Sequence, residues 1–231
     1  MRVPTLHKWD LSPAEAVAVQ QDLRTRVITC DRLGKVHTVA GVDISTAGNR
    51  ARAAIVVLGF PHLEPLEVAR ADMPLTFPYV PGLLAFREAP AILAAAERLR
   101  LEPDLFVFDG HGLAHPRRMG IASHIGVILD RPSIGCAKSL LCGQHDDVGA
   151  EVGDHAEVID HGEVIGAALR TREGTKPVYV SIGHKVDLAT AVSYVLRCTA
   201  GYRLPEPTRW AHRLAGGGEL PRPTALQASL L

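Results

Sequence analysis

Two aspartates stand inside or at the end of apolar segments, where a carboxylate is costly to bury. Asp43 interrupts the apolar run of residues 39–44, and in a strand its side chain would lie on the face opposite to those of its two neighbours. Asp109 ends the apolar run of residues 105–108, and ligand crevices open at such strand ends in α/β sheets. A buried carboxylate is destabilising unless it is paired, hydrogen-bonded or bound to a metal. Both aspartates are therefore candidate metal ligands.

Glu88 is a third acid in an apolar setting. Leu84 precedes it by four residues and Ile92 follows it by four, so a helix that continues through Pro90 places Glu88 on the same inward face. Three converging acids would suit Mg²⁺, which prefers a few carboxylates completed by water and substrate phosphate. A structural interpretation stays open for each acid, because Glu88 could pair with Arg87 and the two aspartates could belong to turns.

The elements that would position these acids form a mixed α/β pattern. Ser12, Pro13 and Glu15 are typical of a capped helix start, and Asp187 is a candidate cap for a later helix. We predict strands and helices from apolar periodicity and from turn residues. The predicted strands are 36–44, 51–60, 66–73, 105–109, 127–129, 163–170 and 178–182, and the predicted helices begin at 13 and span 83–89, 90–100, 115–126 and 188–198. Short links predict that the first three strands are antiparallel neighbours, followed by strands that alternate with helices.

Composition and charge limit the class of protein. The chain has 231 residues and equal numbers of acidic and basic residues, 25 of each. Seven of the acids lie in the segment 144–163, which lacks lysine and arginine and which we expect to be an exposed loop pointing away from any nucleic acid. The remaining chain carries a net charge of +7, so a local basic surface for nucleic acid is compatible with the neutral total.

Location and domain organisation follow from the same survey. No apolar run approaches the ~20 residues that span a bilayer, and we expect no membrane partner. The four cysteines form no CxxC pair, which favours a reducing, cytoplasmic location. We expect one domain over residues 1–214 and a flexible tail over 215–231, where glycine and proline are frequent.

Several long strings in the right order resemble those of the endonuclease V family, and together they touch most of the chain from about residue 35 to residue 213. They are GVDIS (41–45), FPYVPGLLAFREAP (77–90), PDLFVFDGHGLAHPRRMGIASHIGV (103–127), RPSIGCAKSLL (131–141), KPVYVSIGHKVDL (176–188) and YRLPEPTRWAH (202–212). The resemblance implies a ribonuclease-H-like α/β fold, with a mixed central sheet of three antiparallel strands followed by parallel strands, flanked by helices. It also implies a Mg²⁺-dependent endonuclease for DNA repair, with Mn²⁺ as a substitute. Such an enzyme recognises hypoxanthine, the base of inosine, in DNA and cleaves the second phosphodiester bond on its 3′ side. The cut leaves a 3′-hydroxyl and a 5′-phosphate.

The resemblance assigns roles to particular residues. It implies that Asp43 and Asp109 hold the metal, that Glu88 is the third acid of the active site, and that His212 completes the site. Lys138 matches a lysine that contacts the backbone phosphate near the cut, as a compact positive charge would. The base contacts are implied to come from a wedge and from a pocket, formed by Tyr79 as the wedge and by Leu84, Gly110 and Gly112 in the pocket.

Alternatives stay open at this level. The same chemistry could act mainly on inosine-containing RNA, whose single strands present unstacked bases, or the fold could serve as a non-catalytic nucleic-acid-binding module. Taken alone, Tyr79 could be a packing residue, Lys138 a solvated charge, and His212 a surface histidine. We expect the protein to act as a monomer.

Overall fold

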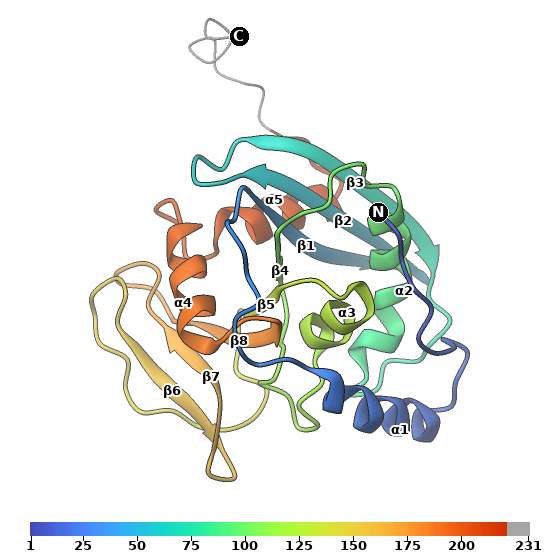
Figure 1. Ribbon diagram of the computed structural model, residues 1–231, viewed down its shortest axis with the longest axis horizontal. Helices are drawn as coiled ribbons and strands as arrows, with labels where there is room; N and C mark the ends of the chain where they lie inside the picture. The colour runs from blue at the N-terminus through green and yellow to red at the C-terminus, as the bar shows by residue number, and fades with distance from the viewer. Residues whose placement is uncertain (221–231) are drawn as a thin grey trace, which may run out of the picture.

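The computed structural model describes residues 1–220 and contains one eight-stranded mixed sheet (Figure 1). The strand order across the sheet is β3-β2-β1-β4-β5-β8-β7-β6. The strands, in chain order, are β1 (Thr38–Ala47), β2 (Arg50–Gly59), β3 (Pro65–Pro74), β4 (Leu105–Phe108), β5 (Ser133–Ala137), β6 (His155–Asp160), β7 (Glu163–Leu169) and β8 (Val178–His184). β1, β2 and β3 are antiparallel neighbours, and β4 and β5 continue the sheet parallel to β1. The predicted fold class, a mixed α/β sheet flanked by helices, is confirmed, but only β4 and β5 are the parallel strands that we expected, since β8, β7 and β6 pair antiparallel.

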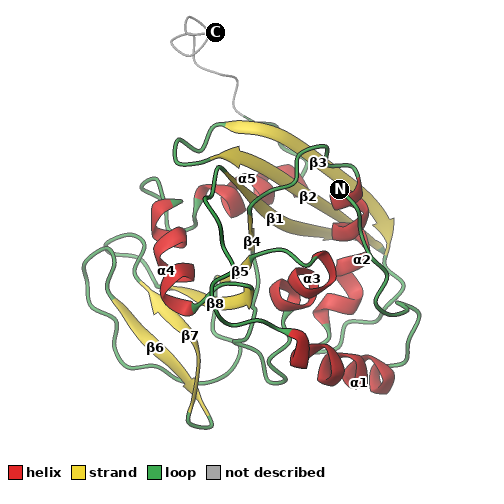
Figure 2. Cartoon of the chain, viewed as in Figure 1, coloured by secondary structure: helices red, strands yellow, loops and turns green. Residues whose placement is uncertain are grey.

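Helices cover both faces of this sheet (Figure 2). They are α1 (Pro13–Leu23), α2 (Leu84–Glu97), α3 (Ile121–Leu129), α4 (Leu188–Arg197) and α5 (Glu206–Ala215), with a short 3-10 helix at Arg24–Arg26. α2 and α3 pack on one face of β1–β4, and α5 packs behind β1 and β2 in the view of Figure 1. α4 packs against β7 and β8. None of the helices within residues 1–220 is long and apolar enough to cross a membrane.

The prediction of two helices that separate at Pro90 is wrong, because α2 runs without a break from Leu84 to Glu97. Proline in a helix removes one backbone donor, so the Phe86 carbonyl loses its helical partner. The apolar face of α2, which includes the fully buried Ala89 and Ala95, packs against the sheet and outweighs this loss.

The segment after β4 also differs from the prediction of a helix over 115–126 and a strand over 127–129. The helix begins six residues later, at Ile121, and continues to Leu129. Residues 113–119 form turns instead, in which Pro116 is exposed and Arg118 has a positive φ of 56°. The strand that follows is β5, which we did not predict from the sequence.

The acidic segment is only partly the exposed loop that we expected. Residues 146–154 form loop and turns, but residues 155–160 form the edge strand β6, paired with β7. β6 and β7 lie at the far end of the sheet from β3. The predicted tail begins within the described part of the chain, where α5 ends at Ala215, but its residues 221–231 lie outside the described residues.

Close packing of α5 on β1 depends on the absence of a side chain at Gly41. A Cβ atom there would lie 1.9 Å from the backbone oxygen of Pro207, in the first turn of α5. We expect Gly41→Ala to lower the free energy of unfolding by about 2 kcal/mol or more, because neither backbone can yield freely. Denaturant unfolding measures this, with Gly34→Ala as the matched control, since a Cβ at Gly34 meets nothing within 4 Å. Equal stability of the two variants would contradict the prediction.

Candidate active site

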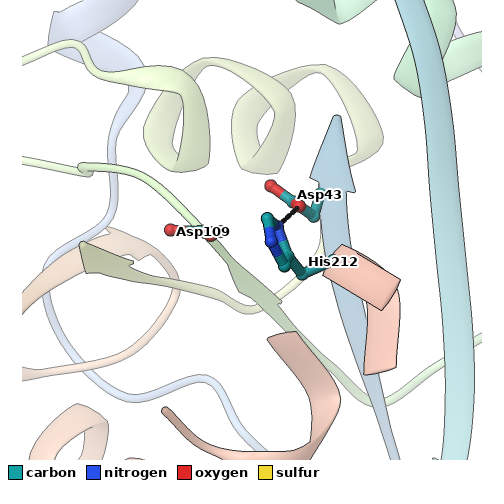
Figure 3. A group of neighbouring side chains, drawn as sticks. All are labelled: Asp43, Asp109 and His212. Atoms are coloured by element: carbon teal, nitrogen blue, oxygen red, sulfur yellow. Dashed lines mark hydrogen bonds and ion pairs between the residues drawn. The ribbon is translucent and has the colours of Figure 1, made fainter. Parts of the chain in front are cut away.

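The site begins where α5 crosses β1. Asp43 lies in the middle of β1 and is only 9% exposed. His212 lies on α5, 169 residues further along the chain, and its Nδ1 is 2.7 Å from Asp43 Oδ2 (Figure 3). The Asp43 side chain shares the α5 face of β1 with Gly41, as strand alternation requires. The close approach of α5 to β1 at Gly41 therefore lets His212, on the same helix, reach Asp43.

Asp109 comes to the same place from the neighbouring strand. It directly follows β4, and its backbone N–H donates to the Val42 carbonyl of β1 at 3.0 Å. Lys138, which directly follows β5, forms an ion pair with Asp109. Oxygen and nitrogen atoms of Asp43, Asp109 and His212 all lie within 4.8 Å of one another. The parallel order β1-β4-β5 thus gathers residues that are far apart in sequence.

Glu88 lies near this group without being one of its members. It projects from α2 and its side chain is half-buried. Burial, and next the negative charge of Asp43, raise the pKa of Glu88 to about 7, although Arg87 opposes the rise. Burial and the charge of Asp109 likewise raise the pKa of Asp43 above its ordinary value. The carboxylates are therefore close enough to repel one another.

This arrangement fits a divalent cation. Hard carboxylate oxygens on one side of a partly open site are the donors that Mg²⁺ takes, with water and substrate filling the other positions. A bound cation would also relieve the mutual repulsion that raises the carboxylate pKa values. Asp43 and Asp109 are the candidate ligands. His212, which is 62% exposed at its side chain, is placed to orient Asp43.

A cavity of about 240 Å³ opens beside Asp109. Tyr79, Leu84 and Gly110 line it, and the contacts with a base that we expect from these three residues stay a prediction. Tyr79 is 72% exposed, on the segment that precedes α2. Gly112 does not line the cavity, since it is buried where a Cβ would lie 2.0 Å from the Ile182 backbone oxygen of β8.

The cavity also has walls that we did not identify from the sequence. They come from the segments after β4 and β5 and from the start of α3, and include His111, Ile121, Ser139, Leu140 and Leu141. Ser139 and Leu140 directly follow Lys138, at the end of β5. Because we did not predict β5 from the sequence, we had no reason to place these two residues beside the cavity. Asp187, by contrast, caps α4 as predicted, with its Oδ1 accepting from the Thr190 N–H at 2.7 Å. His184 accepts from the Ile28 N–H and is not a member of the group around Asp43.

Comparison with known proteins gives one consistent family. The family model described as Endonuclease V matches residues 21–213. An endonuclease V from Roseiflexus is 58% identical over 93% of this chain and 96% of its own length. The crystal structure of an endonuclease V from Streptomyces avermitilis has a TM-score of 0.87 and 42% identity, covering 100% of this chain and 99% of that one. A Ciona intestinalis endonuclease V, bound to a 24mer DNA containing an inosine followed by a ribo-adenosine, has a TM-score of 0.78 and 31% identity, covering 88% of this chain and 96% of its own.

Proposed function

Because the chain belongs to the endonuclease V family, we propose that it is a magnesium-dependent endonuclease that recognises hypoxanthine in DNA. We propose that it cleaves the second phosphodiester bond 3′ to that base, leaves a 3′-hydroxyl and a 5′-phosphate, and serves DNA repair as a single nuclease domain. One observation carries the proposal, namely that the group of Asp43, Asp109 and His212 lies beside a cavity of about 240 Å³. The Ciona relative bound to inosine-containing DNA supports the same substrate class.

The two aspartates would hold the metal against the phosphate to be cut. A bound divalent cation supplies charge neutralisation at the phosphate oxygens and a more acidic water. Lys138 neutralises Asp109 in the free protein and is 41% exposed at its side chain, so it can turn its ammonium group towards an incoming phosphate. His212 holds Asp43 in place by the hydrogen bond between them. Glu88 adds a third carboxyl group from the α2 side of the same site, and a bound cation would favour its charged form.

The cavity would take the displaced base. Gly110 leaves room at its wall, because a Cβ there would lie 2.7 Å from Ile121 Cγ2. Removing a base from the stack costs a few kcal/mol, and an aromatic ring that fills the gap offsets part of this cost. Tyr79 is exposed at the rim of the cavity, and Pro78 and Pro81 restrict the backbone on either side of it. We therefore propose Tyr79 as the wedge and the cavity as the site of the hypoxanthine.

Cleavage of a labelled duplex with a single deoxyinosine tests the proposed function. We expect one break, at the second phosphodiester bond 3′ to the inosine, in Mg²⁺ or Mn²⁺, and loss of that break when a chelator removes the metal. An inosine-free duplex is the control. Cleavage that persists in chelator would contradict the metal role, and binding without cleavage in Mg²⁺ would favour a non-catalytic module.

The same assay separates DNA from RNA as the main substrate. Matched single strands of inosine-containing DNA and RNA present unstacked bases, so base displacement contributes little to the difference between them. We expect faster cleavage of the DNA strand. Faster cleavage of the RNA strand would make the protein an inosine-specific endoribonuclease that uses the same metal site.

A further inference from the structure

Exposed arginines surround a second hollow, of about 360 Å³, at the C-terminal end of α5. Arg52 comes from β2, Arg70 from β3 and Arg98 from the end of α2. We call these three residues the arginine surface. None of the three belongs to the candidate metal group, which is Asp43, Asp109 and His212, and none lines the base cavity, which is the cavity of about 240 Å³ beside Asp109.

The strand register places Arg52 and Arg70 on the same face of the sheet as Asp43, and Arg98 reaches the hollow from the end of α2, beside the edge strand β3. Asp43 pairs with Ala54 of β2, and Ala54 pairs with Arg70 of β3, so the three side chains form one row. Arg52 belongs to the next row on that face, two residues along β2. Neighbouring strands are about 4.8 Å apart, so Arg70 and Asp43 are separated by about 10 Å along the row. A stacked strand of nucleic acid covers that distance in about three nucleotides.

The three guanidinium groups of the arginine surface form few hydrogen bonds and ion pairs within the protein. Asp72 is the single acid that lines the hollow, and Arg50 already holds it at 2.6 Å, while Arg52 is 3.8 Å from it. Arg70 donates to the Gly218 carbonyl at 2.9 Å, which supports the end of α5, and Arg98 donates to the Arg70 carbonyl. Each guanidinium has five N–H donors, so donors remain for an anion. Supporting α5 explains Arg70 but does not explain Arg52.

The position of the arginine surface relative to the base cavity indicates which flank of a bound nucleic-acid strand would reach it. The cavity is lined by residues that follow β4 and β5, such as Gly110 and Ser139, on one side of β1. The arginine surface lies on the other side of β1, over β2 and β3, and the metal group lies between them. Because α5 covers Ala54 in the middle of the row, a strand with its base in the cavity and its phosphate at Asp43 would pass over the exposed His212 and the C-terminal end of α5 to reach the arginine surface. Because the proposed cut is 3′ to the base, the part that continues is the 3′ flank.

We propose that the arginine surface binds the backbone phosphates of the nucleic-acid strand on the 3′ side of the cut. This inference rests on the proposed function for its direction. Guanidinium groups bind phosphate through two parallel hydrogen bonds, and they do so without reading the bases. The surface therefore adds affinity that is independent of sequence, sensitive to salt and dependent on the length of the 3′ flank.

The test uses the double variant Arg52→Gln with Arg70→Gln. Arg172→Gln with Arg24→Gln is the matched control, since both residues are exposed arginines away from this face. A second double variant, Arg52→Lys with Arg70→Lys, keeps the positive charges. Thermal unfolding of all variants shows whether removing the hydrogen bond from Arg70 to Gly218 changes the fold.

The substrates are labelled single strands with one deoxyinosine and 3′ flanks of about three or about twelve nucleotides beyond it, so that only the long flank reaches the surface. On the long flank, we expect the glutamine variant to lose about tenfold in kcat/KM, and we expect the loss to shrink towards zero on the short flank. A plot of the logarithm of the binding constant against the logarithm of the salt concentration should become less steep for the long flank. We expect its slope to decrease by about one to two, because each phosphate that is no longer neutralised contributes about 0.7. The lysine variant should retain most of the salt slope, because it keeps both positive charges, and should lose less activity than the glutamine variant although it lacks the paired hydrogen bonds.

An equal loss on long and short flanks, or a loss no larger than that of the control pair, would overturn the proposal. A loss that follows the length of the 5′ flank instead would overturn its direction. Binding of the same strands, measured by fluorescence anisotropy without metal, keeps the test independent of cleavage. If the natural protein cuts no inosine-containing strand, the proposed function fails, and the flank dependence of binding still decides whether the arginine surface holds phosphates.

Discussion

Asp43→Asn should lower the cleavage rate of inosine-containing DNA by about a thousandfold or more while the fold persists. The carboxylate is 9% exposed, receives a hydrogen bond from His212, and lies within 4.8 Å of an Asp109 oxygen. Asparagine keeps the shape but removes a negative charge from the candidate metal ligands, and its amide is a much weaker ligand for Mg²⁺. The loss should therefore fall on the metal and on the chemical step.

The same substitution should not lower the stability of the protein. Burial and the charge of Asp109 raise the pKa of Asp43, so the charged form opposes folding at neutral pH. Removing that charge relieves the repulsion, and we expect the unfolding temperature of Asp43→Asn to equal or exceed that of the natural protein. Such a trade of stability for activity is typical of active sites.

Single-turnover cleavage together with thermal unfolding measures both effects. Asp147→Asn, at an exposed acid in the loop before β6, is the matched control and should change neither. Cleavage by Asp43→Asn within tenfold of the natural rate would contradict the metal role of Asp43. A large fall in its unfolding temperature would instead indicate that the charge stabilises the fold.

The acids of the site could be predicted from local pattern, because a carboxylate inside an apolar run is conspicuous in any sequence. Asp43 lies within β1 and Asp109 directly follows β4, and the parallel pairing of these two strands brings the two carboxylates together. Lys138 and His212 have no such local signal. His212 reaches Asp43 across 169 residues, through the packing of α5 on Gly41, and only the resemblance to a family pointed to it.

The wrong predictions of secondary structure also arise where contacts between distant segments, and not the local sequence, decide the structure. Pro90 predicts a break, but the helix around it is held by packing against the sheet, which local propensity does not contain. β6 carries the exposed Glu157 and the partly buried Asp160, so its composition resembles that of a loop, and its pairing with β7 decides its structure. Residues 133–137 were missed because a five-residue buried strand leaves little periodicity to detect.

Buried neutral histidines should make the fold sensitive to mild acid. His124 is 0% exposed and contacts the rings of Trp9 and Phe86, and its Nε2 is 2.7 Å from Nε2 of His7. Burial lowers the pKa of His124 to about 3. His115 is 4% exposed, and burial, with the nearby charge of Arg117, lowers its pKa to about 4.

The hydrogen bonds of these histidines agree with neutral rings. His115 Nε2 donates to the Gly82 carbonyl, and its Nδ1 accepts from the Arg117 N–H. His7 Nδ1 faces the Lys8 carbonyl, which can only accept, so the neutral His7 accepts at Nε2 from His124. Protonation would remove the acceptor at His115 Nδ1 and would place a charge at the fully buried His124 Nδ1, which has no hydrogen-bond partner among the described residues.

The direction of the pH effect follows from these lowered pKa values. In the unfolded chain both histidines have a pKa of about 6.5, so below that pH the unfolded state binds more protons than the folded state. Their contribution to stability is complete above about pH 6.5 and is lost progressively as the pH falls towards 4 and then 3. At pH 5 each histidine should account for a loss of about 2 kcal/mol, or about 4 kcal/mol together. A loss of this size is a large part of the stability of a typical domain, about 5–15 kcal/mol.

Denaturant unfolding at a series of pH values, compared between the natural protein and His124→Gln, isolates one of these contributions. The variant loses some stability at every pH, but its free energy of unfolding should fall about 2 kcal/mol less between pH 7.5 and pH 5, since it has no imidazole to protonate at that position. His62→Gln, at an exposed histidine, is the matched control and should leave the slope as it is. Parallel curves for His124→Gln and the natural protein would show that His124 titrates alike in both states, and that its burial among the rings of Trp9 and Phe86 does not hold it neutral.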